Sequence, residues 1–183
     1  MQLKSFVKAR KLASFQLAVA AVFAALVAVA TMTFFMPIPA TSGYFNFGET
    51  FIYIAALLFG PFVGLIAGAG AAISDIMISP SYAPVTFIVK ALEGFFVGFL
   101  IKKFNRKIKN FTLCATIAIL IGGFEMIAGY FIYETFMYGY AVALLEVPVN
   151  IGQMLVGLII AVPIMHAVLH VFPQFKNYLQ EIQ

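Results

Sequence analysis

Residues 12–48 read LASFQLAVAAVFAALVAVATMTFFMPIPATSGYFNFG and contain no charged side chain. A helix needs about 20 apolar residues to cross the hydrocarbon core of a bilayer, so this stretch is long enough for a membrane span. Lys4, Lys8, Arg10 and Lys11 precede it, as basic residues precede the core of a secretory signal peptide. Such a core has only about 7–15 residues, far fewer than this run. We therefore expect a retained first membrane span.

The composition of the whole chain also indicates that this protein lies in a lipid bilayer. Of the 183 residues, 63% are hydrophobic and 10% are charged, and the mean hydropathy is +1.04. Soluble globular domains contain about 45–50% apolar and about 25% charged residues, so this composition excludes them. It also excludes disordered chains, which need low hydrophobicity and high charge. We predict an all-α membrane protein that forms a single integral membrane domain over residues 1–183.

Apolar runs and helix-breaking residues divide the chain into six predicted spans. Residues 50–79 as one helix would extend about 45 Å, too long for one comfortable crossing, so we place a tight turn at Gly60-Pro61. Prolines mark most of the other breaks, because the residue before a proline avoids helical geometry. The predicted helices cover about residues 12–36, 44–60, 61–79, 84–101, 112–137 and 143–172.

The basic residues predict how these helices are oriented. The chain has 11 basic and 7 acidic residues; four basic residues precede residue 12, five lie in 102–109, and Lys176 lies near the end. Six spans place all three groups on one face, as the positive-inside rule requires, whereas five spans would separate the first two. We predict a multi-pass protein of the cell membrane with cytoplasmic amino and carboxyl termini. Because the net charge of +4 then reflects orientation, we predict no nucleic-acid partner.

Polar side chains inside the predicted spans are the candidate functional residues, because a charge facing lipid costs about 2.5–3.5 kcal/mol. Lys90 and Glu93 share one helix face, where they either pair with each other or line a polar cavity. Glu49 either binds a ligand or stabilises the positive end of its own helix. Most polar residues, with several tyrosines, fall in the outer half of the membrane. We predict an outward-facing binding cavity formed by Asn46, Glu49, Tyr82, Lys90, Glu93, Glu125, Tyr138, Asn150 and Gln153.

The sequence lacks motifs for catalysis or for ATP hydrolysis. It contains no G-x-x-x-x-G-K-[ST], no G-x-S-x-G and no H-E-x-x-H. Cys114 is the single cysteine, so an internal disulfide or a cysteine metal cluster is impossible. His166 and His170 have the spacing of two metal ligands, but no carboxylate lies near them in the sequence. We predict that the chain is not an enzyme and holds neither metal nor cofactor.

The first span carries overlapping A-x-x-x-A pairs, formed by Ala20, Ala21, Ala24, Ala25 and Ala28. Small residues at this spacing let two helices approach closely in a membrane. The face either packs inside the molecule or docks a separate membrane protein. We predict that these five alanines form a second site, where a partner membrane protein docks.

Several short motifs occur in a fixed order along nearly the whole chain. They are Phe45-Asn46-Phe47-Gly48-Glu49, Leu58-Phe59-Gly60-Pro61 with Gly64 and Gly68, Asp75, Ala83-Pro84, Lys90 with Glu93-Gly94, and Pro148-x-Asn150-x-x-Gln153. In this order they resemble the substrate-binding S components of energy-coupling factor (ECF) vitamin transporters, and most closely the riboflavin-type S components.

The resemblance implies a function that fits the missing ATP site and the alanine face. Such a protein binds a vitamin from outside with high affinity and associates through its alanine face with a transmembrane coupling protein and two ATPases. It then topples in the membrane to release the ligand inside. Family members bind riboflavin, pyridoxine or the hydroxymethylpyrimidine precursor of thiamine, and the resemblance assigns none of these to this chain.

We therefore predict the substrate-binding subunit of an ATP-driven ABC importer for a water-soluble vitamin or related small molecule. The alternative is a self-sufficient proton-coupled carrier or channel, in which Lys90, Glu93 and other carboxylates relay protons. An intramembrane enzyme is disfavoured because no nucleophile is paired with a base. A ligand-free scaffold is disfavoured by the polar groups inside the spans.

Overall fold

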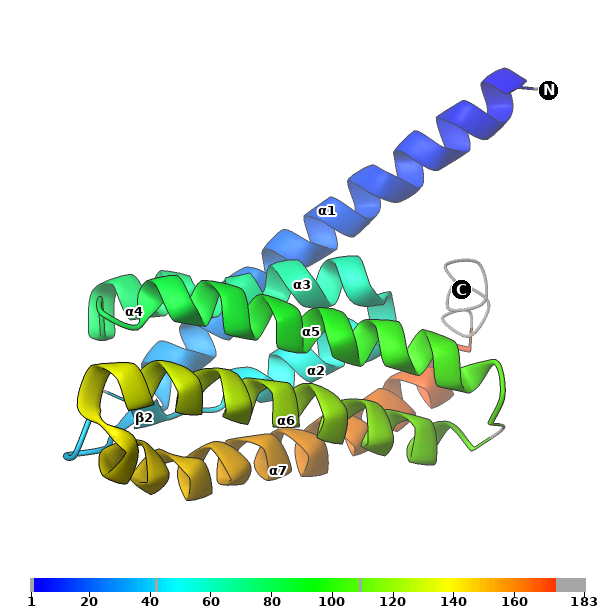
Figure 1. Ribbon diagram of the computed structural model, residues 1–183. Coiled ribbons are helices and arrows are strands. Elements are labelled where there is room, and N and C mark those ends of the chain that lie inside the picture. The colour runs from blue at the N-terminus through cyan, green and yellow to red at the C-terminus, as the bar shows by residue number, and fades with distance from the viewer. Residues whose placement is uncertain (1, 42, 109, 174–183) are drawn as a thin grey trace.

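A computed structural model describes residues 2–41, 43–108 and 110–173, with side chains described from residue 12 onward. The helices are α1 (Gln2–Thr33), α2 (Gly48–Phe59), α3 (Pro61–Ala69), α4 (Ala71–Ile78), α5 (Ala83–Asn105), α6 (Phe111–Tyr138) and α7 (Tyr140–Val171). A short antiparallel pair, β1 (Met36–Pro37) and β2 (Tyr44–Phe45), connects α1 to α2. The predicted all-α membrane bundle is confirmed (Figure 1).

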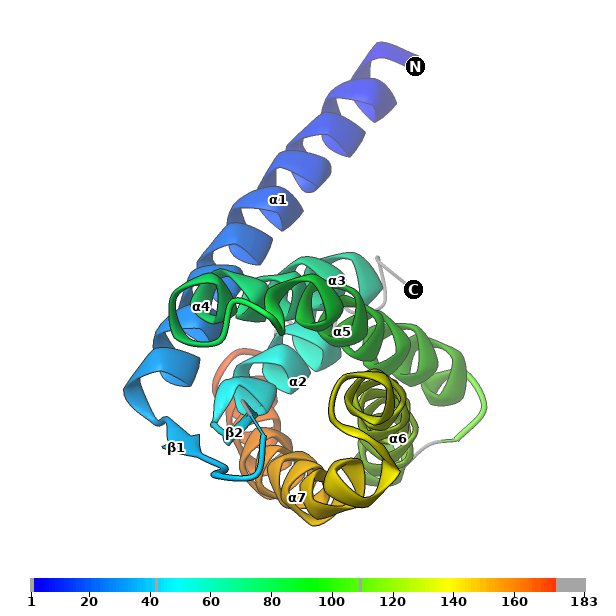
Figure 2. The ribbon, with the colours of Figure 1, turned by 60° about the vertical axis from the view of Figure 1, so that its left-hand side comes forward.

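Five segments are long and apolar enough to cross a membrane: Leu12–Thr33, Pro61–Ile78, Ala83–Asn105, Phe111–Tyr138 and Tyr140–Val171. The predicted second span contains α2, a shorter apolar helix in which every residue except Phe51 is buried, and its crossing of the membrane stays a prediction. It packs against α1, α3, α5 and α7, so the other helices separate it from lipid (Figure 2). A helix enclosed by protein does not need the length of a lipid-facing span, because its neighbours replace the hydrocarbon around it.

The helix boundaries differ from the predicted ones in several places. α1 begins at Gln2, well before residue 12. The second helix begins at Gly48 and not at residue 44, because Tyr44 and Phe45 pair with β1. The third span is interrupted at Gly70, whose backbone lies against that of Ala24; an added Cβ would come within 2.5 Å of the Ala24 carbonyl oxygen. α5 extends into the basic stretch as far as Asn105.

Figure 1 shows at which end of the bundle the predicted groups of basic residues lie. The amino-terminal end of α1 and the α5–α6 loop lie toward the same end of the bundle, with the β1–β2 connection at the opposite end. Lys102, Lys103, Arg106 and Lys107 belong to that loop region, whereas Lys109 and Lys176 lie outside the described residues. Which end faces the cytoplasm stays a prediction.

Glycines allow α3 and α5 to approach each other closely. A Cβ on Gly64 would lie 2.3 Å from the Gly94 carbonyl oxygen, and one on Gly68 would lie 1.8 Å from the Lys90 carbonyl oxygen. Helices in a bilayer gain little from hydrophobicity when they associate, so close backbone contact through small residues is a main source of their packing energy. The glycines thereby fix the position of Lys90 relative to α3.

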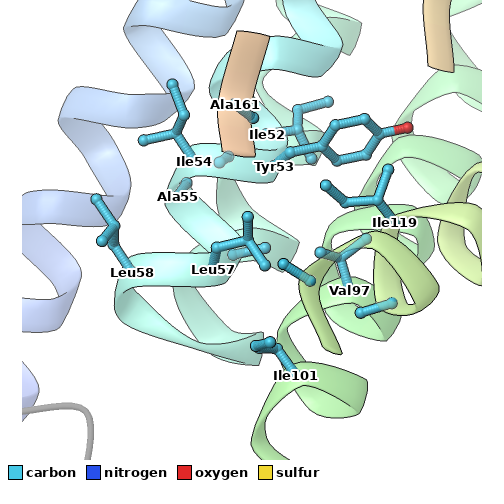
Figure 3. Packing of buried hydrophobic residues seen from close by; sticks show 14 of the residues in the cluster. Ile52, Tyr53, Ile54, Ala55, Leu57, Leu58, Val97, Ile101, Ile119 and Ala161 are labelled. Carbon is cyan, nitrogen blue, oxygen red and sulfur yellow. The ribbon is translucent and has the colours of Figure 1, made fainter. Parts of the chain in front are cut away.

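The apolar core surrounds α2. Figure 3 shows Ile52, Tyr53 and Leu57 of α2 beside Val97 of α5 and Ile119 of α6. All five side chains are fully buried. Because Tyr53 belongs to this core, its hydroxyl group is held at a fixed place in the bundle interior.

We predict that Gly68→Ala destabilises the protein, because the new methyl group meets a backbone carbonyl that cannot rotate away. Overpacking of this kind costs about 1–3 kcal/mol. Gly152→Ala in α7 is the matched control, since its Cβ would meet only the Phe45 ring at 3.9 Å. Thermal unfolding in detergent should show a lower midpoint for Gly68→Ala alone; equal midpoints for the two variants would contradict the packing argument.

Candidate functional site

A polar cavity lies at the end of the bundle that carries the β1–β2 connection. Its lining comes from the connection itself, from the carboxyl-terminal parts of α1 and α6, from the first half of α4 with Asp75, and from the amino-terminal parts of α2, α5 and α7. The cavity volume is about 30 Å³, room for about two water molecules. The side chains around it therefore contact mainly one another.

A larger cavity of about 210 Å³ lies at the opposite end, between α1, the α2–α3 turn and α5. Its lining is apolar apart from Gln16 and Lys102. Ligand sites combine apolar walls with several convergent polar groups that fix orientation. The smaller, polar cavity fits that description better and is the candidate site.

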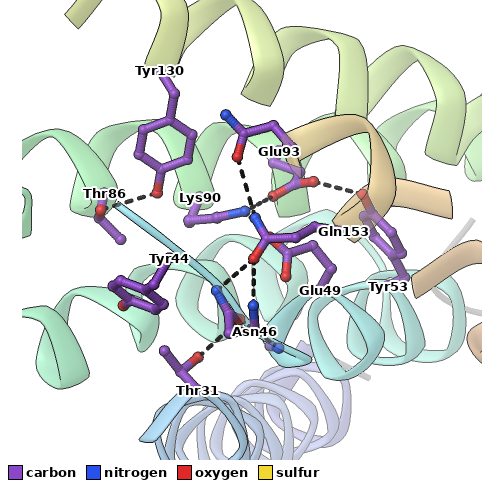
Figure 4. Close-up of polar contacts among 12 residues, drawn as sticks. Thr31, Tyr44, Asn46, Glu49, Tyr53, Thr86, Lys90, Glu93, Tyr130 and Gln153 are labelled. Carbon is purple, nitrogen blue, oxygen red and sulfur yellow. Dashed lines mark hydrogen bonds and ion pairs between the residues drawn. The ribbon is translucent and has the colours of Figure 1, made fainter. Parts of the chain in front are cut away.

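A buried lysine stands between two carboxylates at the inner edge of the polar cavity. The Lys90 ammonium group is paired with Glu49 of α2 and lies 3.2 Å from Glu93 Oε2 in its own helix. The Tyr53 hydroxyl donates to Glu93 Oε1 at 2.6 Å, and Lys90 Nζ lies 5.4 Å from the centre of the Tyr130 ring (Figure 4). Lys90 and Glu93 thus do pair with each other, and Glu49 joins them from another helix.

Side-chain amides connect the loop before α2 to α7. The Asn46 backbone nitrogen and Nδ2 both donate to Gln153 Oε1, at 2.7 and 2.8 Å. Gln153 Nε2 donates to Asn150 Oδ1 at 3.3 Å, and Asn46 Oδ1 accepts from the Gly48 backbone at 2.7 Å. Asn46, Asn150 and Gln153 thus form one chain of amides along the cavity wall.

Two hydroxyl groups of the β1–β2 connection reach buried carboxylates. Thr41 donates to Glu146 of α7, and Tyr44 donates to Asp75 of α4. Burial and the neighbouring Asp75 carboxylate raise the pKa of Tyr44 above its ordinary value, so its hydroxyl stays protonated and acts as a donor. The connection is therefore held over the cavity by polar contacts to two helices.

Tyrosines from α5 and α6 close the other side of the cavity. The Tyr82 hydroxyl donates to Glu134 Oε1 at 3.2 Å, and the Tyr130 hydroxyl lies 3.0 Å from Thr86 Oγ1. Tyr138 stacks on the Tyr82 ring at a centroid distance of 6.4 Å. Tyr138 thus supports Tyr82 from outside the cavity lining.

The structure brings most of the predicted ligand-binding residues to one place. Asn46, Glu49, Tyr82, Lys90, Asn150 and Gln153 line the polar cavity. Glu93, Glu125 and Tyr138 do not: Glu93 lies behind Lys90, Tyr138 lies behind Tyr82, and Glu125 lies in the middle of α6. That any of these residues binds a ligand stays a prediction.

Several lining residues were not among the predicted ligand-binding residues. Asp75, Glu134 and Glu146 are three carboxylates that line the cavity but are absent from the predicted set of ligand-binding residues. Thr31, Thr86 and Tyr130 had no local signal at all, since isolated hydroxyl residues are unremarkable in an apolar helix. Only the packing of α1 and α5 against α2, and of α6 against α5, brings them together.

The alanine face of α1 is divided between two environments. Ala20, Ala24 and Ala28 are buried inside the molecule. Ala21 and Ala25 are exposed. Internal packing thus accounts for one part of the face, and only the other part is free to meet a separate helix.

The two histidines do not assemble a metal site. His166 Nε2 lies 2.7 Å from the Thr112 hydroxyl oxygen, which joins α7 to the start of α6. Across the residues that the structure describes, no three His, Cys, Asp or Glu side chains come together to hold a metal ion.

Sequence comparisons identify related proteins. The family described as ECF-type riboflavin transporter, S component, matches residues 11–170. A Pyrococcus woesei protein described as "uncharacterized protein in gap 3'region" is 38% identical over 135 residues, covering 73% of this chain and 88% of that protein. The thiamine precursor transporter HmpT of Lactococcus lactis subsp. cremoris (strain MG1363) is 31% identical over 149 residues, covering 80% of this chain and 82% of that protein.

Two solved structures have the same fold. ThiT from Listeria monocytogenes superposes with a TM-score of 0.66 at 17% sequence identity, covering 88% of this chain and 96% of that chain. The S component of a bacterial ECF transporter superposes with a TM-score of 0.62 at 19% identity, covering 91% of this chain and 98% of that chain.

We predict that Lys90→Met lowers the free energy of unfolding by about 3–5 kcal/mol, because it leaves two buried carboxylates without their counter-ion. Lys103→Met is the matched control, since Lys103 lies in the same helix but is exposed. It should change stability by less than about 0.5 kcal/mol. Thermal unfolding in detergent compares the two, and an unchanged midpoint for Lys90→Met would refute the structural role of the ion pair.

Proposed function

Because the chain belongs to the ECF-type riboflavin transporter S component family, we propose that it captures a water-soluble vitamin or related small molecule outside the cell for ATP-driven uptake. S components are transport subunits and not enzymes, and the chain is a multi-pass membrane protein. We propose the class of substrate, the orientation of the chain in the membrane and its coupling to ATPases. The observation that supports it most is the polar cavity enclosed within an otherwise apolar bundle.

The groups around the cavity are suited to a polar ligand with a flat ring. Amide groups of Asn46, Asn150 and Gln153 both donate and accept hydrogen bonds. Tyr82 and Tyr130 offer ring faces beside them. In this proposal Glu93 is a positioning residue, because it contacts Lys90 and not the cavity. The ligand is of the riboflavin, pyridoxine or hydroxymethylpyrimidine type, and the likeness to HmpT supports including the last.

Ligand entry requires the cavity to open. Its volume of about 30 Å³ is far below the 300–1,000 Å³ of typical small-molecule pockets. The β1–β2 connection is the element best suited to move, because Thr41, Tyr44 and Asn46 attach it through hydrogen bonds that a polar ligand can replace. We propose that this end of the bundle faces the cell exterior, with both termini cytoplasmic.

Coupling to ATP hydrolysis must come from other proteins, since the sequence has no phosphate-binding motif. We propose a transmembrane coupling protein and two ATPase subunits as partners. The exposed alanines Ala21 and Ala25 mark the surface of α1 that a partner helix can approach closely. The buried alanines of the same helix serve the internal packing.

We predict that Asn150→Ala weakens ligand binding about tenfold or more while the protein still folds, because the amide chain along the cavity wall loses one member. Asn105→Ala is the control, since Asn105 ends α5 at the opposite end of the bundle. Equilibrium dialysis of the purified protein against riboflavin, pyridoxine and hydroxymethylpyrimidine measures both. Unchanged affinity in Asn150→Ala would remove this residue from the binding site.

Reconstitution distinguishes the proposal from a self-sufficient carrier. We predict that this chain alone in liposomes accumulates no ligand, with or without a proton gradient, and that uptake appears when a coupling protein and ATPases are added with ATP. Uptake by the chain alone would favour a proton-coupled carrier or channel instead.

We predict that Ala25→Leu impairs assembly with the coupling protein and abolishes most transport but leaves ligand binding by the isolated chain unchanged. The added side chain occupies the surface that a partner helix must approach. Ala167→Leu in α7 is the control, since Ala167 is also exposed but lies on another helix. Co-purification of the complex measures assembly, and normal assembly of Ala25→Leu would exclude this part of α1 from the interface.

A further inference from the structure

Hydrogen-bond acceptors outnumber donors in the polar cavity. Four carboxylates line it, those of Glu49, Asp75, Glu134 and Glu146, together with the single ammonium group of Lys90. All five side chains are buried, with exposed fractions of 1–3%. An ionised carboxylate only accepts hydrogen bonds. The lining is therefore rich in hydrogen-bond acceptors and holds one positive charge.

The protein itself supplies few hydrogen-bond donors to these carboxylates. One hydroxyl group reaches each of three carboxylates: Thr41 donates to Glu146, Tyr44 to Asp75, and Tyr82 to Glu134. A hydroxyl group carries no charge, so none of these contacts supplies a counter-charge to a carboxylate. The charge of Lys90 is already divided between Glu49 and Glu93, and Glu93 lies behind the cavity.

Two carboxylate oxygens in the lining remain without a donor. Glu49 Oε2 and Glu134 Oε2 are buried and accept no hydrogen bond from any residue that the structure describes. Buried polar atoms in native proteins nearly always have a partner, and an unpaired one next to a charged group is costly. Both atoms belong to side chains that line the same cavity, so a bound molecule is the natural source of the missing donors.

We propose that the ligand of this cavity presents hydrogen-bond donors, as an amine, an amidine or an amino-substituted ring, and carries no phosphate or carboxylate group. The proposal rests on the proposed function and narrows its substrate class. Lys90 has three donors, of which two go to Glu49 and Glu93. It therefore adds the requirement for one acceptor atom on the ligand, such as a ring nitrogen or oxygen.

The lining also has no free positive charge for an anionic ligand. A phosphate group carries about −1.5 to −2 charges at neutral pH, and the one ammonium group in the lining is already paired with Glu49 and Glu93. A buried charge without a partner loses its hydration with no compensation. Phosphorylated forms of a vitamin are thus rejected, and uptake is restricted to the free compound.

The proposed ligand class is tested by measuring how pairs of related compounds bind to the purified full chain. The probes are riboflavin, pyridoxamine and hydroxymethylpyrimidine, each with its own phosphate ester, and pyridoxine as the amine-free partner of pyridoxamine. We expect pyridoxamine to bind at least about tenfold more tightly than pyridoxine, the difference that one hydrogen bond to a charged group makes. We also expect each free compound to bind more tightly than its phosphate ester. A phosphate ester that binds as tightly as its parent compound would overturn the proposal.

Two variants in one helix test whether the Glu134 carboxylate is responsible. Glu134→Gln should weaken binding of the amino compound about tenfold or more, while its Oε1 still accepts from Tyr82 and preserves the fold. Thr112→Val is the matched control, because Thr112 also lies in α6 but at the opposite end of the bundle, outside the cavity lining. It should change the dissociation constant less than about twofold. Unchanged binding by Glu134→Gln would also overturn the proposal.

A separate outcome addresses the proposed function itself. If none of the probes binds, mass spectrometry of small molecules released from the freshly purified protein identifies its ligand. A released anion or a compound without donors overturns the ligand class but leaves a binding protein, whereas a donor-bearing compound supports the class. If nothing is released and nothing binds, the proposed capture function fails together with the inference.

Discussion

A buried lysine between two carboxylates is the interaction on which the arrangement of helices depends. Neither Lys90 nor Glu49 is stable alone inside an apolar bundle, because an isolated charge there loses its hydration without compensation. Their pairing requires α2 and α5 to lie at one relative height. The glycine contacts between α3 and α5 fix the same region from the other side, since Gly68 packs directly on the Lys90 backbone. Electrostatics and backbone packing thus specify one position together.

The polar cavity follows from this arrangement. α2 is enclosed by its neighbours and is shorter than a full span, so the chain before it must cross the end of the bundle as the β1–β2 connection. Polar groups of that connection then meet the ends of α4 and α7, at Asp75 and Glu146. The groups that close the bundle at this end are also those that line the cavity. The side chains that hold this end of the bundle together are thus the ones that we propose to bind a ligand.

Much of this architecture was accessible from the sequence. Hydrophobic length and composition specify a membrane bundle, because a lipid solvent imposes about 20 apolar residues on each exposed crossing. The scarcity of charge made Glu49, Lys90 and Glu93 conspicuous, and Asn150 and Gln153 stood out as polar residues in an apolar predicted span. The missing ATP-binding motif predicted only that any ATP-driven transport needs other subunits. These properties are set by local composition and periodicity, which need no knowledge of neighbours.

The tertiary structure decided what each of these residues contacts. Spacing alone could not show that Ala24 faces the bundle whereas Ala25 faces outward, because both belong to overlapping A-x-x-x-A pairs. It could not separate Glu134, which lines the cavity, from Glu125 in the same helix, nor reveal Thr31, Thr86 and Tyr130. The sequence determines which helices form and which residues lipid does not tolerate. Only the rotation and height of the packed helices decide where those residues meet, because these depend on contacts between distant segments.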